Sequence, residues 1–108
     1  MDKLISRAVE LVEEELDRAN EQYPLFASPH EGYGVILEEV EETENESLSV
    51  TKCLNDLWKN IKSDNKVSEY ESVLGRMAQS AILAACENIQ VAAMCRKYIQ
   101  SLEDKEEK

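Results

Sequence analysis

The most constraining feature of this sequence is the apolar run AILAACENIQVAAMC at residues 81–95, in which Glu87 is the one carboxylate. A helix that is apolar on nearly every side is normally buried, and small residues allow neighbouring helices to approach closely. A buried carboxylate without a partner is costly, so Glu87 should be protonated, hydrogen-bonded or bound to a cation. The run therefore predicts a buried helix that carries a functional or paired carboxylate at its centre.

The rest of the chain also favours helices. The 108 residues include three glycines and two prolines, both prolines lie within residues 23–29, and apolar residues recur at helical spacing elsewhere. We predict an all-α fold with helices over about 2–21, from about 29 to 62, and from about 68 to 102, with a kink or short break near 43–51.

Local signals mark the predicted helix ends. Asp2 is a plausible first cap, and Ser28, Pro29 and Glu31 have the pattern of a capped helix start. The segment Ser-Asp-Asn at residues 63–65 is expected to end the second helical region.

The predicted helices are too long for a compact three-helix monomer, because a helix of about 30 residues spans roughly 45 Å. We predict one helical domain over residues 1–103, followed by a flexible charged tail at residues 104–108. The expected fold class is a long-helix bundle completed by homo-oligomerisation, as a dimer or a tetramer.

Composition excludes several classes of partner. The net charge of −11 argues against binding to nucleic-acid polymers. There is no uncharged apolar stretch of about 18 residues for a membrane span, and the N-terminus is too charged for a signal peptide. Cys53, Cys86 and Cys95 form no CxxC pair, and we expect them to be buried core residues of a cytoplasmic protein.

Carboxylates gather on one predicted face of the helix that begins near residue 29. At 100° per residue, Glu38 and Glu42 lie within about 20° of Glu31, and Glu39 and Glu46 lie on the same side. Such like charges repel, and a divalent cation would neutralise them. Oxygen ligands select Mg²⁺ or Mn²⁺, whereas the alternative interpretation is a solvated acidic face without metal.

Two segments and one spacing resemble a known family. HEGYGVILEE at residues 30–39, ENIQVAAM at residues 87–94 and the ExxE pair Glu39 and Glu42 resemble the MazG-like all-α nucleotide pyrophosphohydrolases, closest to small phage- or prophage-associated members. The resemblance extends from about Leu4 to Leu102. It implies an oligomeric helical bundle and Mg²⁺-dependent cleavage of a nucleoside triphosphate to the monophosphate and pyrophosphate, a nucleotide-pool housecleaning activity.

The resemblance also implies roles for individual residues. Glu39 and Glu42 would form the first metal-binding pair, and Glu87 would begin the second. The family pattern ExxD has an aspartate where this chain has Gln90, which offers an amide oxygen to the metal but one negative charge fewer. Glu38 or Glu39 would orient or deprotonate the attacking water.

Candidates for substrate binding come from charge and aromatic character. Among the cations of the last helical region, Arg76 is favoured over Arg96, because the angle count places it on the Glu87 face. Tyr33 and Trp58 are candidates for stacking on a base, with core packing as the alternative for each.

Two other functions remain open on the sequence alone. One is a non-catalytic helical oligomer that retains the family scaffold as a nucleotide- or protein-binding module, which the departure at Gln90 favours. The other is a metal-free acidic bundle in which Glu87 pairs with Arg76. The acidic face together with Glu87 favours the enzyme.

Overall fold

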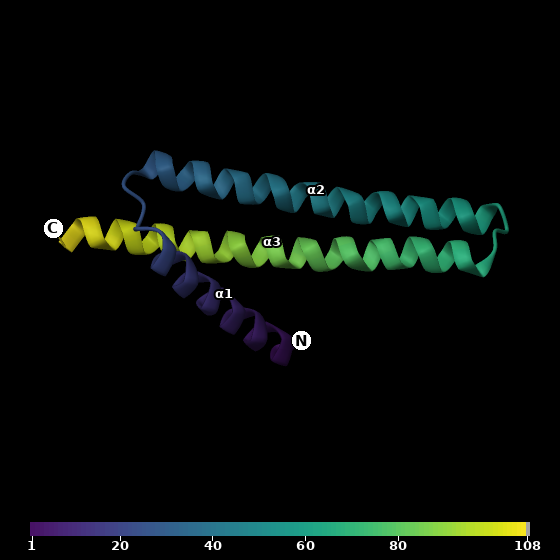
Figure 1. The fold of residues 1–108 in the computed structure, drawn as a ribbon, viewed down its shortest axis with the longest axis horizontal. Helices are drawn as coiled ribbons and strands as arrows, with labels where there is room; N and C mark the ends of the chain where they lie inside the picture. Colours follow the sequence, from purple (N-terminus) through teal and green to yellow (C-terminus); the bar gives the residue numbers. More distant parts are fainter. Residues whose placement is uncertain (108) are drawn as a thin grey trace. The chain divides into compact units, whose positions relative to one another are not determined.

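The computed structural model describes residues 1–107, and these residues are helical apart from Met1 and the two segments that connect the helices. The three helices are α1 (Asp2–Gln22), α2 (Pro29–Lys62) and α3 (Val67–Glu107) (Figure 1). The predicted all-α fold is confirmed for the described chain. No helix among these residues has the length and hydropathy needed to span a membrane. The predicted tail overlaps the last turns of α3, and Lys108 lies outside the described residues.

The helix start after the second proline has the predicted cap. The Ser28 hydroxyl accepts a hydrogen bond of 3.1 Å from the Glu31 N–H, and the Glu31 carboxylate accepts one of 3.3 Å from the Ala27 N–H. Pro29 is the first residue of α2, where its missing N–H costs nothing. Just before Pro24, Tyr23 ends α1 in an extended conformation, as the residue before a proline prefers.

The predicted stop at residues 63–65 is a Schellman motif. The Asn65 N–H donates to the Asn60 carbonyl at 3.1 Å, and the Asp64 N–H donates to the Ile61 carbonyl at 3.2 Å. Asp64 has a φ of 53°, a left-handed conformation that aspartate tolerates better than most residues. The turn reverses the chain between α2 and α3.

Two local predictions are wrong. Met1, and not Asp2, is the N-cap of α1, and it makes no side-chain cap hydrogen bond. The expected break at residues 43–51 does not occur, because α2 continues through them. Weak helix formers cost only about 0.5 kcal/mol each, and contacts with α3, such as the Ser49–Ser80 hydroxyl hydrogen bond of 2.8 Å, offset that cost.

The chain divides into two compact units. The first contains Met1–Val40 and the chain from Glu87 onward, so it combines α1 with the start of α2 and the end of α3. Its buried core comes from α1, from α3 and from the segment after α1, and Val35 and Ile36 of α2 are partly buried against it. The buried residues are Val12, Leu16, Phe26, Ala93 and Met94.

The second unit is the helical hairpin Glu41–Cys86, in which the end of α2 and the start of α3 are joined by the Schellman turn (Figure 1). Its buried apolar side chains are Cys53 and Val73, while many of its larger apolar side chains are exposed. A two-helix hairpin has only one internal contact line, so it buries little apolar surface.

The expectation of a fully buried run at residues 81–95 is wrong for the single chain. Ala93 and Met94 are buried, but Ile82 and Leu83 are exposed. Cys86 and Cys95 are also exposed, and only Cys53 is a buried thiol.

Candidate functional site

Three carboxylates predicted as metal ligands lie together. Glu39, Glu42 and Glu87 each offer one oxygen, and these oxygens lie within 4.8 Å of one another. Glu39 and Glu87 belong to the first unit. Glu42 follows Glu39 by one turn on the continuous helix α2, so the helix itself sets the distance between them. Glu39 and Glu87 are partly buried and Glu42 is exposed.

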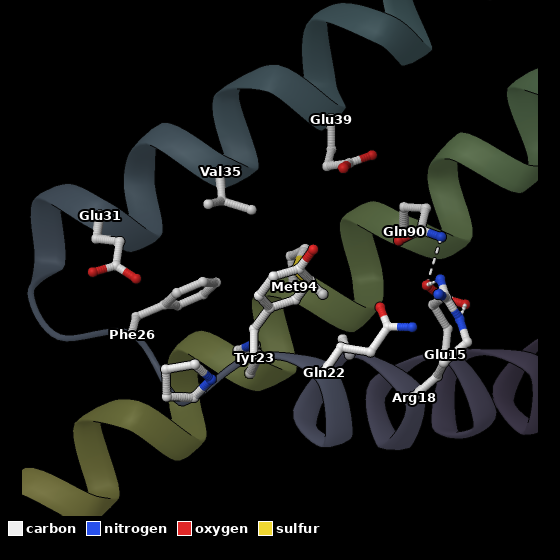
Figure 2. Close-up of a pocket in the computed structure, with 13 residues that line it drawn as sticks. Glu15, Arg18, Gln22, Tyr23, Phe26, Glu31, Val35, Glu39, Gln90 and Met94 are labelled. Atoms are coloured by element: carbon white, nitrogen blue, oxygen red, sulfur yellow. Dashed lines mark hydrogen bonds and ion pairs between the residues drawn. The ribbon is translucent and has the colours of Figure 1, made fainter.

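A cavity of ≈ 400 Å³ lies within the first unit. Its wall combines aromatic and apolar side chains with amides, carboxylates and two cations (Figure 2). The lining residues are Glu15, Arg18, Ala19, Gln22, Tyr23, Pro24, Phe26, Glu31, Val35, Glu39, Gln90, Met94 and Lys97.

Glu39 connects the two features, because it belongs both to the carboxylate cluster and to the cavity wall. Figure 2 shows Glu39 and Glu31 extending from α2 toward the cavity, with Tyr23 and Met94 on the other side. A molecule held in the cavity would therefore present one end to the carboxylate cluster.

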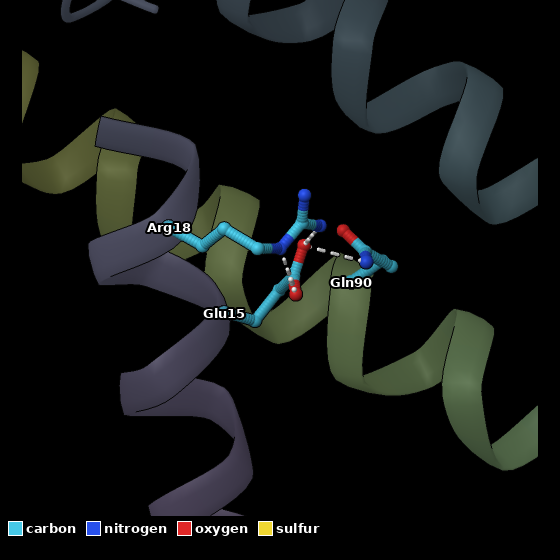
Figure 3. Close-up of polar contacts among 3 residues, drawn as sticks. All are labelled: Glu15, Arg18 and Gln90. Atoms are coloured by element: carbon cyan, nitrogen blue, oxygen red, sulfur yellow. Dashed lines mark hydrogen bonds and ion pairs between the residues drawn. The ribbon is translucent and has the colours of Figure 1, made fainter. Parts of the chain in front are cut away.

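The predicted ligand Gln90 has a different partner. Its Nε2 donates a hydrogen bond of 2.7 Å to Oε1 of Glu15 on α1 (Figure 3). The Arg18 guanidinium donates to the same carboxylate, with Nε at 3.0 Å from Oε2. The hydrogen bond from Arg18 is the main cause that lowers the pKa of Glu15, Gln90 adds to it, and burial opposes it. The amide of Gln90 suits this position because its N–H donates to the Glu15 carboxylate, whose lowered pKa favours the ionised form.

This contact gives a physical reason for the departure from the ExxD pattern. We expect Gln90→Asp to lower stability by about 1–3 kcal/mol at neutral pH, because a donor is lost and a second carboxylate approaches Glu15. Urea unfolding measures the change, which should shrink as the pH falls through the carboxyl range near about 4. The loss should also shrink in a Glu15→Gln background. A Gln90→Asp chain as stable as the parent at pH 7 would contradict this role.

Lys97 is the cation most enclosed by the cavity wall. The residue is 3% exposed, and its ammonium lies 5.2 Å from the centroid of the Phe26 ring and 6.0 Å from that of Tyr23. Burial lowers the pKa of Lys97, and attraction by Glu31 opposes that effect. The cavity thus combines a positive charge with two aromatic rings.

The other predicted site residues belong neither to the carboxylate cluster nor to the cavity wall. Glu38 is exposed beside Glu39, and Tyr33 is 65% exposed and does not line the cavity. Arg76 and Trp58 belong to the second unit, where Arg76 is exposed and Trp58 is 57% exposed. The aromatic residues of the cavity wall are Tyr23 and Phe26, and its cations are Arg18 and Lys97.

Comparison of the chain with protein-family models, with curated proteins and with solved structures found no match. The kind of site is therefore inferred from the residues of this structure. It is an all-α protein whose described residues place a cluster of three carboxylates next to a cavity with aromatic and cationic walls.

Proposed function

We propose that this chain is a Mg²⁺-dependent nucleoside triphosphate pyrophosphohydrolase of the MazG-like type, acting on the cytoplasmic nucleotide pool as a homo-oligomer. The position of Glu39, in both the carboxylate cluster and the cavity wall, carries the proposal. A nucleotide has an aromatic base and a polyphosphate, so it needs an apolar pocket that borders a charged site.

The donor set fits a hard divalent cation. Mg²⁺ and Mn²⁺ prefer oxygen ligands, and Glu39, Glu42 and Glu87 supply three carboxylates from two helices. When bound, the cation would neutralise phosphate oxygens and lower the pKa of a water molecule. The exposed Glu38, adjacent to Glu39, is the candidate for orienting or deprotonating that water.

The cavity fits a nucleoside. Its volume of ≈ 400 Å³ lies in the range of small-molecule sites, about 300–1,000 Å³. Tyr23 and Phe26 offer ring faces to a base, and the amides of Gln22 and Gln90 offer donors and acceptors to its edge. Arg18 supplies positive charge for phosphate oxygens, the role that the sequence suggested for Arg76, whereas Lys97 lies beside the two rings.

A second candidate function is nucleotide binding without hydrolysis. The specific observation that favours it is the Gln90–Glu15 hydrogen bond, because the α3 side of the site has one carboxylate fewer than the family pattern. A site with less negative charge holds a divalent cation more weakly.

Pyrophosphate release from a panel of ribo- and deoxyribonucleoside triphosphates tests the proposal. We expect release with Mg²⁺ or Mn²⁺ and none with EDTA. The same nucleotides are added to a thermal-unfolding assay, because a ligand that binds the folded state raises the melting temperature. Folded protein that releases no pyrophosphate from any nucleotide would overturn the enzyme, and a melting shift in that case would support the binding protein.

A further inference from the structure

Lys97 is enclosed to a degree that is unusual for its side chain. The residue is 3% exposed, whereas lysine is almost never fully buried in proteins unless it is paired. Its ammonium lies beside the rings of Phe26 and Tyr23, and all three residues line the cavity. Burial of a charge costs free energy, so an apolar side chain would serve the fold at least as well. The lysine therefore points to a ligand in the cavity.

The backbone on both sides of this contact is fixed by one buried hydroxyl. The Ser101 Oγ accepts a hydrogen bond of 2.9 Å from the Phe26 N–H and donates one of 2.8 Å to the Lys97 carbonyl. This hydroxyl ties the segment after α1 to the turn of α3 that carries the lysine. Lys97 and Phe26 are therefore positioned relative to each other before any ligand binds.

This part of the cavity lies away from the carboxylate cluster. Lys97 follows Glu87 by ten residues on α3, which is about 15 Å along the helix. The Glu31 carboxylate attracts Lys97, and it precedes Glu39 by eight residues on α2, about 12 Å. Figure 2 shows Glu31 and Phe26 at one end of the cavity and Glu39 at the other. A nucleotide with its phosphates at the cluster would present the far edge of its base to Lys97.

The chemistry of an ammonium limits what that edge can carry. Lysine has three N–H donors and no acceptor, and ring faces accept only weak hydrogen bonds. The group that meets Lys97 must therefore be an acceptor. Uracil, thymine, guanine and hypoxanthine have an oxygen at the exocyclic position of this edge, whereas cytosine and adenine have an amino group that donates.

We propose that Lys97 donates a hydrogen bond to this exocyclic oxygen, so that the site selects nucleotides with a keto base over those with an amino base. The inference deepens the proposed function and rests on it. An amino base would place a donor against a donor and leave both without a partner in an enclosed site. Because the hydrogen bond involves a charged group, we expect a preference of about 10–100-fold.

Glu31 does not reverse this preference. Its carboxylate would accept from an amino group, but the residue is exposed and already accepts a hydrogen bond of 3.3 Å from the Ala27 N–H. The enclosed Lys97 therefore lies closer to the end of the base. The ring N–H next to the oxygen of a keto base suits Glu31 as a second acceptor.

The test compares two pairs of substrates, UTP with CTP and ITP with ATP, because the bases of each pair differ at this edge alone. Pyrophosphate release with Mg²⁺ gives kcat/KM, and we expect UTP and ITP to be preferred. Lys97→Met should abolish the preference by lowering kcat/KM for UTP and ITP about 10–100-fold, with CTP and ATP nearly unchanged. Arg96→Met, which removes the neighbouring cation outside the cavity wall, should preserve the preference.

Equal turnover within both pairs, a preference for CTP and ATP, or a preference that survives Lys97→Met would overturn the inference and leave the enzyme intact. If Lys97→Met does not fold, Lys97→Gln takes its place, because an amide both donates and accepts and should also lose the preference. If folded protein releases no pyrophosphate, the enzyme is wrong, and melting temperatures with UMP, CMP, IMP and AMP test Lys97 alone. Larger shifts with UMP and IMP would then support the inference, whereas equal shifts or none would overturn it.

Discussion

Replacing Glu87 by glutamine is expected to abolish metal-dependent release of pyrophosphate. Glu87 is the α3 member of the three-carboxylate cluster, and its replacement would leave Glu39 and Glu42 to hold the cation from one helix. Even indirect partners of metal ligands contribute about 10–100-fold, so a direct ligand should contribute more than about 100-fold. Turnover is measured with Mg²⁺ and with Mn²⁺, and the melting temperature is measured with and without each metal.

The melting measurement separates a lost metal site from a damaged fold. Without metal, Glu87→Gln should be neutral or stabilising, because it removes repulsion among carboxylates. With metal, the parent should gain stability and the variant should not. Glu103→Gln, an exposed glutamate on the same helix, is the matched control and should behave like the parent. A Glu87→Gln chain that keeps turnover and the metal-induced shift would show that the cluster is not the site.

The three helices, the start of α2 and the turn after it were predictable because their signals are local, whereas the cap of α1 and the end of α3 were not predicted correctly. Ser28, Pro29 and Glu31 act within one turn, and the hydrogen bonds at Glu31 match the capping pattern. The stop near Asp64 depends on residues that tolerate a left-handed backbone. The continuity of α2 through residues 43–51 was not predictable in this way, because it depends on packing against α3.

The carboxylate cluster was predictable in part. Glu39 and Glu42 are one turn apart, so their proximity follows from helix geometry alone. The distance of Glu87 from this pair depends on how α2 and α3 pack. That part of the prediction came from the resemblance to a family and not from helix geometry. The residues of α1 could not be placed from the sequence, since helical spacing does not show which partners Glu15 and Arg18 meet.

The error about residues 81–95 has a different origin. Apolar character predicts that a helix is covered, but it does not say whether the cover comes from the same chain. Ile82 and Leu83 are exposed here, and so are Leu54, Trp58 and Ile61 of the hairpin. A chain of two such long helices has too few elements to cover them all, which is why the sequence favoured an oligomer.

Gly32→Ala is expected to be strongly destabilising, although alanine is the better helix former. A Cβ at this position would overlap Cδ2 and Cε2 of the Tyr98 ring and approach Phe26 at 3.1 Å. The ring cannot move away easily, because its hydroxyl donates to the Pro29 carbonyl at 3.1 Å and it packs edge-on against Phe26. Overpacking of this kind costs about 1–3 kcal/mol, which urea unfolding would measure.

Gly34→Ala is the matched control for this prediction. It lies two residues further along α2, and nothing lies within 4 Å of its added Cβ. Helix propensity alone should therefore make Gly34→Ala more stable than the parent by up to about 1 kcal/mol. Removing the ring should relieve the clash, so Gly32→Ala should cost much less in a Tyr98→Ala background. If Gly32→Ala and Gly34→Ala changed stability equally, the close approach of Tyr98 to α2 would be wrong, and with it the packing of α2 against α3 beside the cavity.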